Sequence, residues 1–125
     1  MYHVLIVAAG GAIGAAARHL VGLVALRVGG LSFPWGTLTV NIAGSFLMGV
    51  LIALLARRVG ASAELRLFLA TGILGGFTTF SAFSLDVVVL WERGAQLAAA
   101  GYIAASVAGA IAALFFGLMV MRSFA

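Results

Sequence analysis

A polar run at residues 75–84 interrupts an apolar stretch that is long enough to cross a bilayer. It reads Gly-Gly-Phe-Thr-Thr-Phe-Ser-Ala-Phe-Ser, which combines two adjacent glycines with hydroxyl side chains. Non-helical backbone at membrane depth is tolerated only where protein or a water-filled cavity surrounds it. Interrupted membrane helices place their half-helix ends at ion and substrate sites. The run therefore predicts a broken helix with an ion-binding site.

The backbone of this run suggests a cation end. A break at Gly75-Gly76 would leave free carbonyls at the end of the first half-helix, where a cation could bind. Thr78 or Thr79 could then cap the second half-helix. The positive end of that half-helix would face the middle of the membrane.

The side chains of the run suggest an anion end. Phe80 and Phe83 are three residues apart, as are Ser81 and Ser84, so each pair shares one side of a helical turn. The edges of aromatic rings carry positive partial charge. The two rings, with the two serines as candidate donors, could hold a small anion weakly enough to release it, as conduction requires.

Polar groups in the other apolar stretches are candidates for the same path. The amide of Asn41 offers two N–H donors that suit an anion, or it bonds to a neighbouring helix, and both interpretations stand. Tyr102 and Ser106 are four residues apart and share one helix face. They form either a short polar track or ordinary packing.

Two charges lie inside predicted spans. Arg18 is in the first, where a charge is functional, paired, or reaches the interface with its long side chain. Asp86 is the only acidic residue inside the third and is therefore the natural partner of Arg18. The alternative is that Arg18 forms an electropositive entrance for anions, with His19 lining the same vestibule.

The elements that must position these residues are four membrane-spanning helices. Of 125 residues, 65% are hydrophobic and 8% are charged, whereas about 25% are charged in soluble domains. Residues 4–26, 33–56, 67–90 and 97–121 each reach the roughly 20 apolar residues that a span needs. We therefore expect an all-α integral membrane protein, with residues 1–125 forming a single four-helix domain and a break in the third span.

Small residues predict close helix packing. Gly10 with Gly14, and Gly72 with Gly76, have the spacing of helix contacts, and residues 101–117 carry a small residue at every fourth position. Four helices alone enclose little room for a pore, so a dimer is favoured. The same Gly10–Gly14 stretch imitates a dinucleotide-binding turn but lacks the acidic residue expected about 20 positions later.

The charged residues indicate the membrane orientation only weakly, and the composition excludes several classes of function. All seven basic residues are arginines, and most lie at predicted helix ends. Four are on the side of the termini and two on the other, which slightly favours cytoplasmic termini and would permit insertion both ways. There is no basic stripe for nucleic acid, and the absence of cysteine excludes disulfides and thiolate sites.

Over its whole length the chain resembles the Fluc-type (CrcB) fluoride channels of prokaryotes. The likeness is carried by residues 10–18, by residues 33–37 and on to Asn41 and Gly44, and by Gly72 with residues 75–84. The resemblance implies a dual-topology homodimer of two antiparallel subunits, with two fluoride pores at their interface. It also implies passive export of fluoride across the cell (inner) membrane without enzymatic activity.

The resemblance also implies residue roles. It assigns fluoride-facing rings to Phe80 and Phe83, a pore amide to Asn41 and the polar track to Tyr102 and Ser106. A structural Na⁺ ion at the dimer centre would be held by the backbone carbonyls of Gly75 and Thr78 from both subunits. Arg18 would lie near an aqueous entrance. The chain departs from the family at Ala82, where members often carry a threonine, and at Ala110, where some members carry a serine.

Other functions fit less well. A proton-coupled small multidrug exporter needs a carboxylate in the first helix, and the first acidic residue here is Glu64. A purely structural membrane subunit would leave the polar run unexplained. A membrane enzyme is disfavoured because His3 and His19 have no plausible carboxylate neighbours in the sequence.

Overall fold

The computed structural model describes residues 1–58 and 60–124, and its elements are helical. They are α1 (Tyr2–Gly29), α2 (Trp35–Arg57), α3 (Ala63–Arg66), the π-helix η1 (Leu67–Leu74), α4 (Gly75–Phe77), α5 (Phe80–Glu92) and α6 (Gln96–Ser123). Within this described part, four helical stretches are long and apolar enough to cross a membrane: Tyr2–Gly29, Trp35–Arg57, Ala63–Glu92 and Gln96–Ser123. The bounds of these four helical stretches agree with those of the predicted spans to within about one helical turn.

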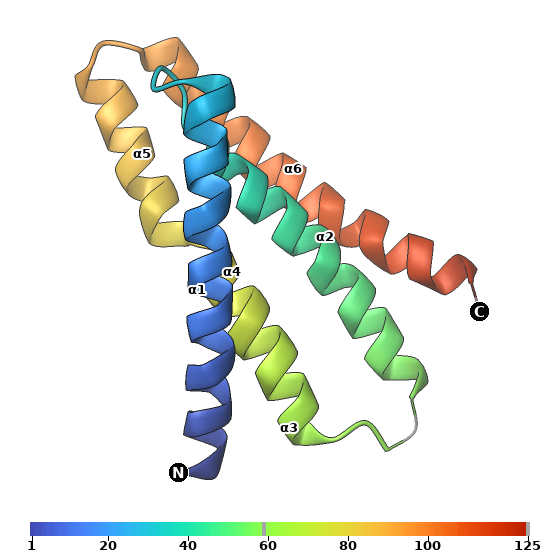
Figure 1. The fold of residues 1–125 in the computed structure, drawn as a ribbon. Coiled ribbons are helices and arrows are strands. Elements are labelled where there is room, and N and C mark those ends of the chain that lie inside the picture. Colours follow the sequence, from blue (N-terminus) through green and yellow to red (C-terminus); the bar gives the residue numbers. More distant parts are fainter. Residues whose placement is uncertain (59, 125) are drawn as a thin grey trace.

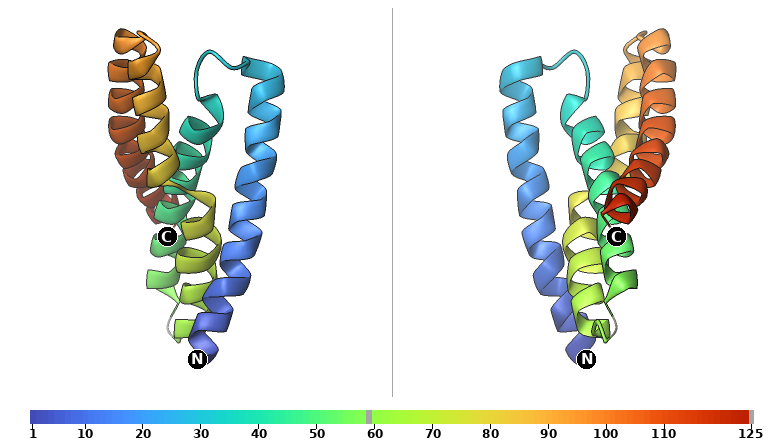
Figure 2. Two further views of the ribbon diagram at one scale, coloured as in Figure 1. Left: turned by 90° about the vertical axis from the view of Figure 1, so that its left-hand side faces the viewer. Right: turned by 90° about the vertical axis from the view of Figure 1, so that its right-hand side faces the viewer.

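The connections alternate between the two ends of the molecule. The α1–α2 and α5–α6 turns lie at one end, and the N-terminus lies with the α2–α3 connection at the other (Figures 1 and 2). Both turns contain a glycine in the left-handed region, Gly30 with φ of 77° and Gly94 with φ of 88°, which other residues rarely adopt. The four helical stretches therefore run alternately toward one end of the molecule and back (Figures 1 and 2).

Close packing of α6 on α2 uses the predicted small residues only in part. A Cβ atom at Gly117 would collide with the carbonyl of Phe46 on α2, and one at Gly109 would approach Ile42 Cδ1 to 3.1 Å. A Cβ at Gly101 would meet nothing within 4 Å. The ribbon of small residues is therefore a helix contact toward its C-terminal end and is open at its start.

The glycines of α1 pack against the third span, as their spacing predicted. A Cβ at Gly10 would come within 2.9 Å of the Cα of Gly72, and one at Gly76 within 2.7 Å of the carbonyl oxygen of Gly11. Backbones in such direct contact require glycine on both sides. The Gly10–Gly14 stretch lies inside one continuous helix, so it forms a helix seam rather than a nucleotide-binding turn.

The third span is interrupted, but not where the sequence suggested. Gly75 and Gly76 remain helical in α4, and the helical path ends after Phe77. Thr78 and Thr79 are extended, with ψ of 158° and 123°. Figures 1 and 2 show α3–α4 and α5 as two arms joined at this point. The prediction of a break at Gly75-Gly76 is therefore wrong, because Gly76 serves close approach to α1.

Local structure on both sides of the break differs from a regular α-helix. Before it, the π-helix η1 lets the amide of Gly75 bond to the carbonyl of Ala70, five residues back. After it, the hydroxyl of Thr79 accepts a hydrogen bond from the amide of Ala82 at 3.1 Å. The predicted threonine cap of the second half-helix is thus confirmed at Thr79.

Candidate functional site

Asn41 of α2 holds the break in place. Its Oδ1 accepts a hydrogen bond from the amide of Thr79 at 2.7 Å, and its Nδ2 donates to the carbonyl of Thr79 at 2.9 Å. In an uninterrupted helix the Thr79 amide would donate to the Gly75 carbonyl. The Asn41 side chain therefore replaces the helical acceptor that the break removes from the Thr79 amide, and the interpretation of Asn41 as a contact between helices is confirmed.

A cavity of about 300 Å³ lies beside the break, and we call it the phenylalanine cavity. Its lining includes Asn41, Thr78, Thr79, Phe80, Phe83 and Ser106. The Ser106 Oγ is buried and has no hydrogen-bond partner among residues 1–58 and 60–124. Buried hydroxyls are normally paired, so this one is available to a bound water or ion.

The two phenylalanines lie together but in different surroundings. Their ring centroids are 5.4 Å apart with the planes inclined by 50°. Phe83 is 7% exposed and belongs to the core, whereas Phe80 is 76% exposed. The shared side of the helix is as predicted, and the Phe80 ring is left open on the surface of this single chain.

The serines of the run do not line the phenylalanine cavity. Ser84 Oγ donates to the carbonyl of Phe80 at 2.9 Å, within its own helix. Ser81 Oγ lies 3.4 Å from the hydroxyl of Thr79. Both residues are exposed on α5.

Tyr102 and Ser106 of α6 are both buried, but their hydroxyls serve different contacts. Tyr102 donates to Asp86 Oδ2 at 2.9 Å and is not part of the cavity lining. Ser106, one turn further along α6, does line the cavity. The structure therefore brings Ser106 to the break and joins Tyr102 to α5 instead.

A second cavity of about 370 Å³, the arginine cavity, also borders Thr79. Arg18, His19, Trp35, Thr37, Thr79 and Asp86 are among the residues that line it. Thr79 borders both cavities. The sequence assigned Thr79 only a capping role, and nothing in its spacing showed that two cavities would meet there.

Arg18 and Asp86 share this cavity, but the expected pair between them is not formed. Arg18 Nε donates to the carbonyl of Gly76 at 3.1 Å, and Asp86 accepts from Tyr102. The Gly76 carbonyl is in the last turn before the break, where carbonyls lack helical donors. Arg18 therefore bonds to a backbone carbonyl and Asp86 to a tyrosine hydroxyl, in place of an ion pair between them.

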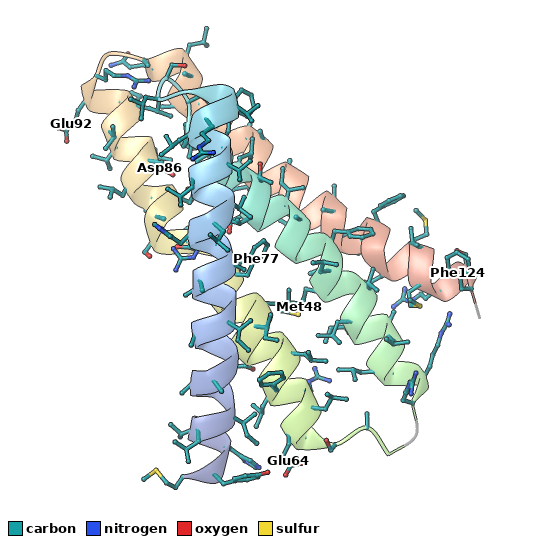
Figure 3. All side chains as sticks on the ribbon, viewed as in Figure 1. Met48, Glu64, Phe77, Asp86, Glu92 and Phe124 are labelled. Atoms are coloured by element: carbon teal, nitrogen blue, oxygen red, sulfur yellow. The ribbon has the colours of Figure 1, made fainter. Side chains whose placement is uncertain are left out.

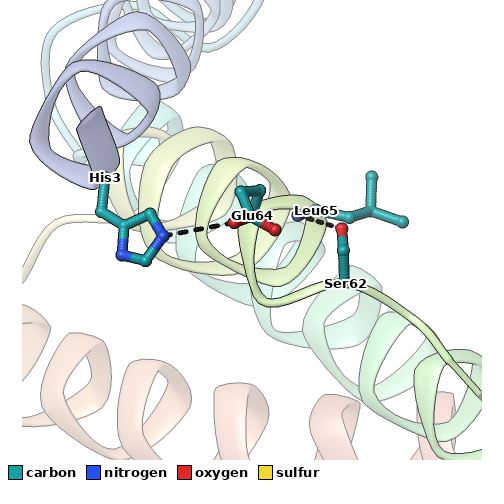
Figure 4. A network of polar contacts seen from close by, with 4 residues as sticks. All are labelled: His3, Ser62, Glu64 and Leu65. Carbon is teal, nitrogen blue, oxygen red and sulfur yellow. Dashed lines mark hydrogen bonds and ion pairs between the residues drawn. The ribbon is translucent and has the colours of Figure 1, made fainter.

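Within the described ranges, the one ion pair is elsewhere. His3 Nε2 lies 3.3 Å from Glu64 Oε1 near the N-terminus of α3, so the fold gives His3 a carboxylate neighbour that is 61 positions away in the sequence (Figure 4). Ser62 caps α3 there by accepting from the amide of Leu65 at 3.1 Å. Both partners of the ion pair are about half exposed, and Glu64 is at the opposite end of the molecule from Asp86 (Figure 3).

The described ranges contain no group of three or more His, Cys, Asp or Glu side chains that could hold a metal ion. The Gly75 carbonyl loses its usual helical donor, since the Thr79 amide bonds to Asn41. Thr78 is extended and lines the phenylalanine cavity.

The two alanines at which the resemblance is incomplete border these cavities. Ala82 lines the arginine cavity and Ala110 lines the phenylalanine cavity. A hydroxyl residue in place of either alanine would add a hydrogen-bond donor to the lining of that cavity. Ser106 is thus the one residue of α6 that contributes a hydroxyl to the lining of the phenylalanine cavity.

Comparison with known proteins agrees with this architecture. The sequence model of the family described as CrcB-like protein, Camphor Resistance (CrcB), matches residues 5–118. The chain is 64% identical over 123 residues to a protein named fluoride-specific ion channel FluC from Chelativorans sp. (strain BNC1), with 98% of each chain covered. Proteins of the same name from Mesorhizobium japonicum and Agrobacterium fabrum are 63% and 58% identical over 98% of each chain. The chain therefore belongs to the CrcB-like family.

Proposed function

We propose that this protein is a fluoride-specific channel through which fluoride leaves the cell passively. The observation that carries the proposal is the phenylalanine cavity beside the helix break, lined by Phe83 and by the buried Ser106 hydroxyl, which has no partner among the described residues. Relatives at 58–64% identity are named fluoride-specific ion channels. A membrane potential that is negative inside drives an anion outward with about 2.3 kcal/mol per 100 mV, so no enzymatic energy source is required.

The two cavities support a path with consecutive sections. The positive charge of Arg18 attracts anions into the arginine cavity. Fluoride then passes Thr79, which borders both cavities, and reaches the phenylalanine cavity. There the Ser106 hydroxyl, the Asn41 amide and the positive edges of Phe80 and Phe83 replace part of its hydration shell.

A second copy of the chain would complete the path. Phe80 is a large ring that is 76% exposed beside the break, and Gly75 is exposed as well. An antiparallel homodimer would cover this face and bring Ser81 and Ser84 to the contact. Such a pair would be embedded in the lipid of the cell (inner) membrane, with subunits inserted in both orientations.

A structural Na⁺ ion at the centre of the dimer would bind the carbonyls of Gly75 and Thr78 from both subunits. The hydrogen bond from Thr79 to Asn41 supports this role because it frees the Gly75 carbonyl. Hard cations prefer oxygen ligands of this kind. The ion would offset the repulsion between carbonyl dipoles that converge at the dimer axis.

A liposome assay tests the proposed function. Purified protein is reconstituted into vesicles loaded with equal concentrations of fluoride and chloride, and the release of each ion is followed with its own electrode. We expect fast fluoride release with chloride retained, and protein-free vesicles serve as the control. Equal release of both anions, or no fluoride release, would refute the proposal.

A further inference from the structure

The hydrogen bond between Asp86 and Tyr102 links the two cavities structurally. We propose that Asp86 is a positioning residue: by accepting the Tyr102 hydroxyl, it fixes the Phe83 ring that forms a wall of the phenylalanine cavity. This inference rests on the proposed function of that cavity. It assigns to Asp86 a role in the geometry of the path rather than contact with the ion.

The contacts form a short chain from the carboxylate to the cavity wall. Tyr102 donates to Asp86 Oδ2 at 2.9 Å. The Tyr102 ring lies 5.2 Å from that of Phe83 and 5.4 Å, edge-on, from that of Phe33, measured between centroids. Phe83 in turn lines the phenylalanine cavity. A movement of the Tyr102 ring must therefore displace one of the two phenylalanines.

Burial makes this chain of contacts stiff. Tyr102 is 0% exposed, and Leu90 and Ala99 beside it are 2% and 1% exposed. Phe83, Asp86 and Leu90 are spaced at three and four residues, so they share one face of α5. Residues packed against a buried ring restrict its rotation, because protein interiors are close-packed. The Tyr102 hydroxyl is thus held by its hydrogen bond to Asp86, and the Tyr102 ring is held by the residues packed against its sides.

The charge of Asp86 makes a geometric role necessary. A carboxylate in the wall of an anion path repels the ion, and a partly buried charge is costly unless it is paired or hydrogen-bonded. Arg18 lines the same cavity but bonds to the Gly76 carbonyl. The Tyr102 hydroxyl is the donor that the structure provides, and an asparagine at position 86 could accept the same hydrogen bond without a charge.

Fluoride efflux from liposomes tests the proposal with four variants. Asp86→Ala and Tyr102→Phe each remove the hydrogen bond, and we expect each to lower the fluoride efflux rate about tenfold, as for a lost bond to a charged group. Asp86→Asn should keep most of the efflux, because its Oδ1 still accepts from Tyr102. The double variant Asp86→Ala/Tyr102→Phe should be no slower than the slower single variant.

The matched control is Glu92→Gln, which removes an acidic charge from the exposed end of the same helix and should leave efflux unchanged (Figure 3). Wild-type efflux for Asp86→Ala would overturn the proposal, as would losses that multiply in the double variant. An Asp86→Asn variant as slow as Asp86→Ala would show that the charge, not the position of the ring, is what matters. If Asp86→Ala does not fold, Tyr102→Phe measured in the Asp86→Asn background decides between these outcomes.

A second readout does not depend on transport. The chain has two tyrosines, so Tyr2→Phe leaves Tyr102 as the single signal in protein labelled with ¹³C at the tyrosine Cζ atom. We expect this resonance to shift in Asp86→Ala and to stay near its wild-type position in Asp86→Asn. No shift in Asp86→Ala would overturn the proposal. If the variants show the expected shifts but the wild-type protein releases no fluoride, the proposed function is refuted instead.

Discussion

Replacement of Asn41 by alanine is the sharpest test of how the helix break is held. It removes two hydrogen bonds, of 2.7 and 2.9 Å, to the amide and carbonyl of Thr79. Leaving a buried backbone group unpaired costs about 1–3 kcal/mol, whereas bonds between membrane helices average about 0.6 kcal/mol and reach about 1.7. Taking the lower range for two bonds, we expect a loss of about 1–3 kcal/mol.

This loss should be visible in two measurements on one preparation. Thermal unfolding in detergent should show a lower midpoint for Asn41→Ala, and fluoride efflux should fall at least tenfold because the Thr79 backbone borders both cavities. A variant with unchanged midpoint and unchanged efflux would refute the interpretation that Asn41 holds the break. A lower midpoint with normal efflux would show that the break has no part in conduction.

Asn41→Asp separates the structural role of this side chain from its electrostatic role. The carboxylate can still accept from the Thr79 amide, so part of the stability should remain. A negative charge in the cavity would repel fluoride by about 4 kcal/mol at 4 Å and an effective dielectric constant of about 20. Efflux should therefore fall by about three powers of ten, and an Asn41→Asp protein that conducts normally would place the ion path elsewhere.

Three further predictions concern the cavity walls and the helix seam. Ser106→Ala should lower fluoride efflux several-fold without lowering stability, because the lost hydroxyl has no partner among the described residues; unchanged efflux would remove Ser106 from the path. Phe83→Ile should reduce fluoride efflux while the size-exclusion profile stays that of the wild type. A variant whose fluoride efflux equals that of the wild type would show that the Phe83 ring has only a packing role. Gly76→Ala should destabilise the protein by about 1–3 kcal/mol, since its Cβ would lie 2.7 Å from the Gly11 carbonyl. Gly101→Ala serves as the control for Gly76→Ala: its Cβ would meet nothing within 4 Å, so this variant should melt like the wild type.

The four spans were predictable because a bilayer imposes one simple requirement, a sufficient length of apolar residues. The existence of a break was also predictable, from glycines and hydroxyls at membrane depth. Its position was not. Two adjacent glycines are compatible with a broken helix and with a close helix contact, and the backbone of Gly11 opposite Gly76 decides between them. That neighbour is 65 positions away in the sequence, and one sequence does not reveal such a contact.

The pairing of charges was misjudged for a related physical reason. Opposite charges at positions 18 and 86 look like partners when only side chains are considered. A helix break, however, creates backbone acceptors and donors that also need partners. Arg18 bonds to the Gly76 carbonyl and so leaves Asp86 to the Tyr102 hydroxyl. The break therefore determined which charges could pair.

The break is best understood as a unit stabilised by three helices. Arg18 of α1 satisfies the Gly76 carbonyl, Asn41 of α2 satisfies both backbone groups of Thr79, and the Thr79 hydroxyl caps α5. The backbone groups in these contacts lie between Gly76 and Ala82, and groups so close are expected to be energetically coupled. Loss of either Arg18 or Asn41 would free backbone that the other also restrains. The same two side chains line the two cavities, so the groups that stabilise the interruption also supply polarity to the proposed path.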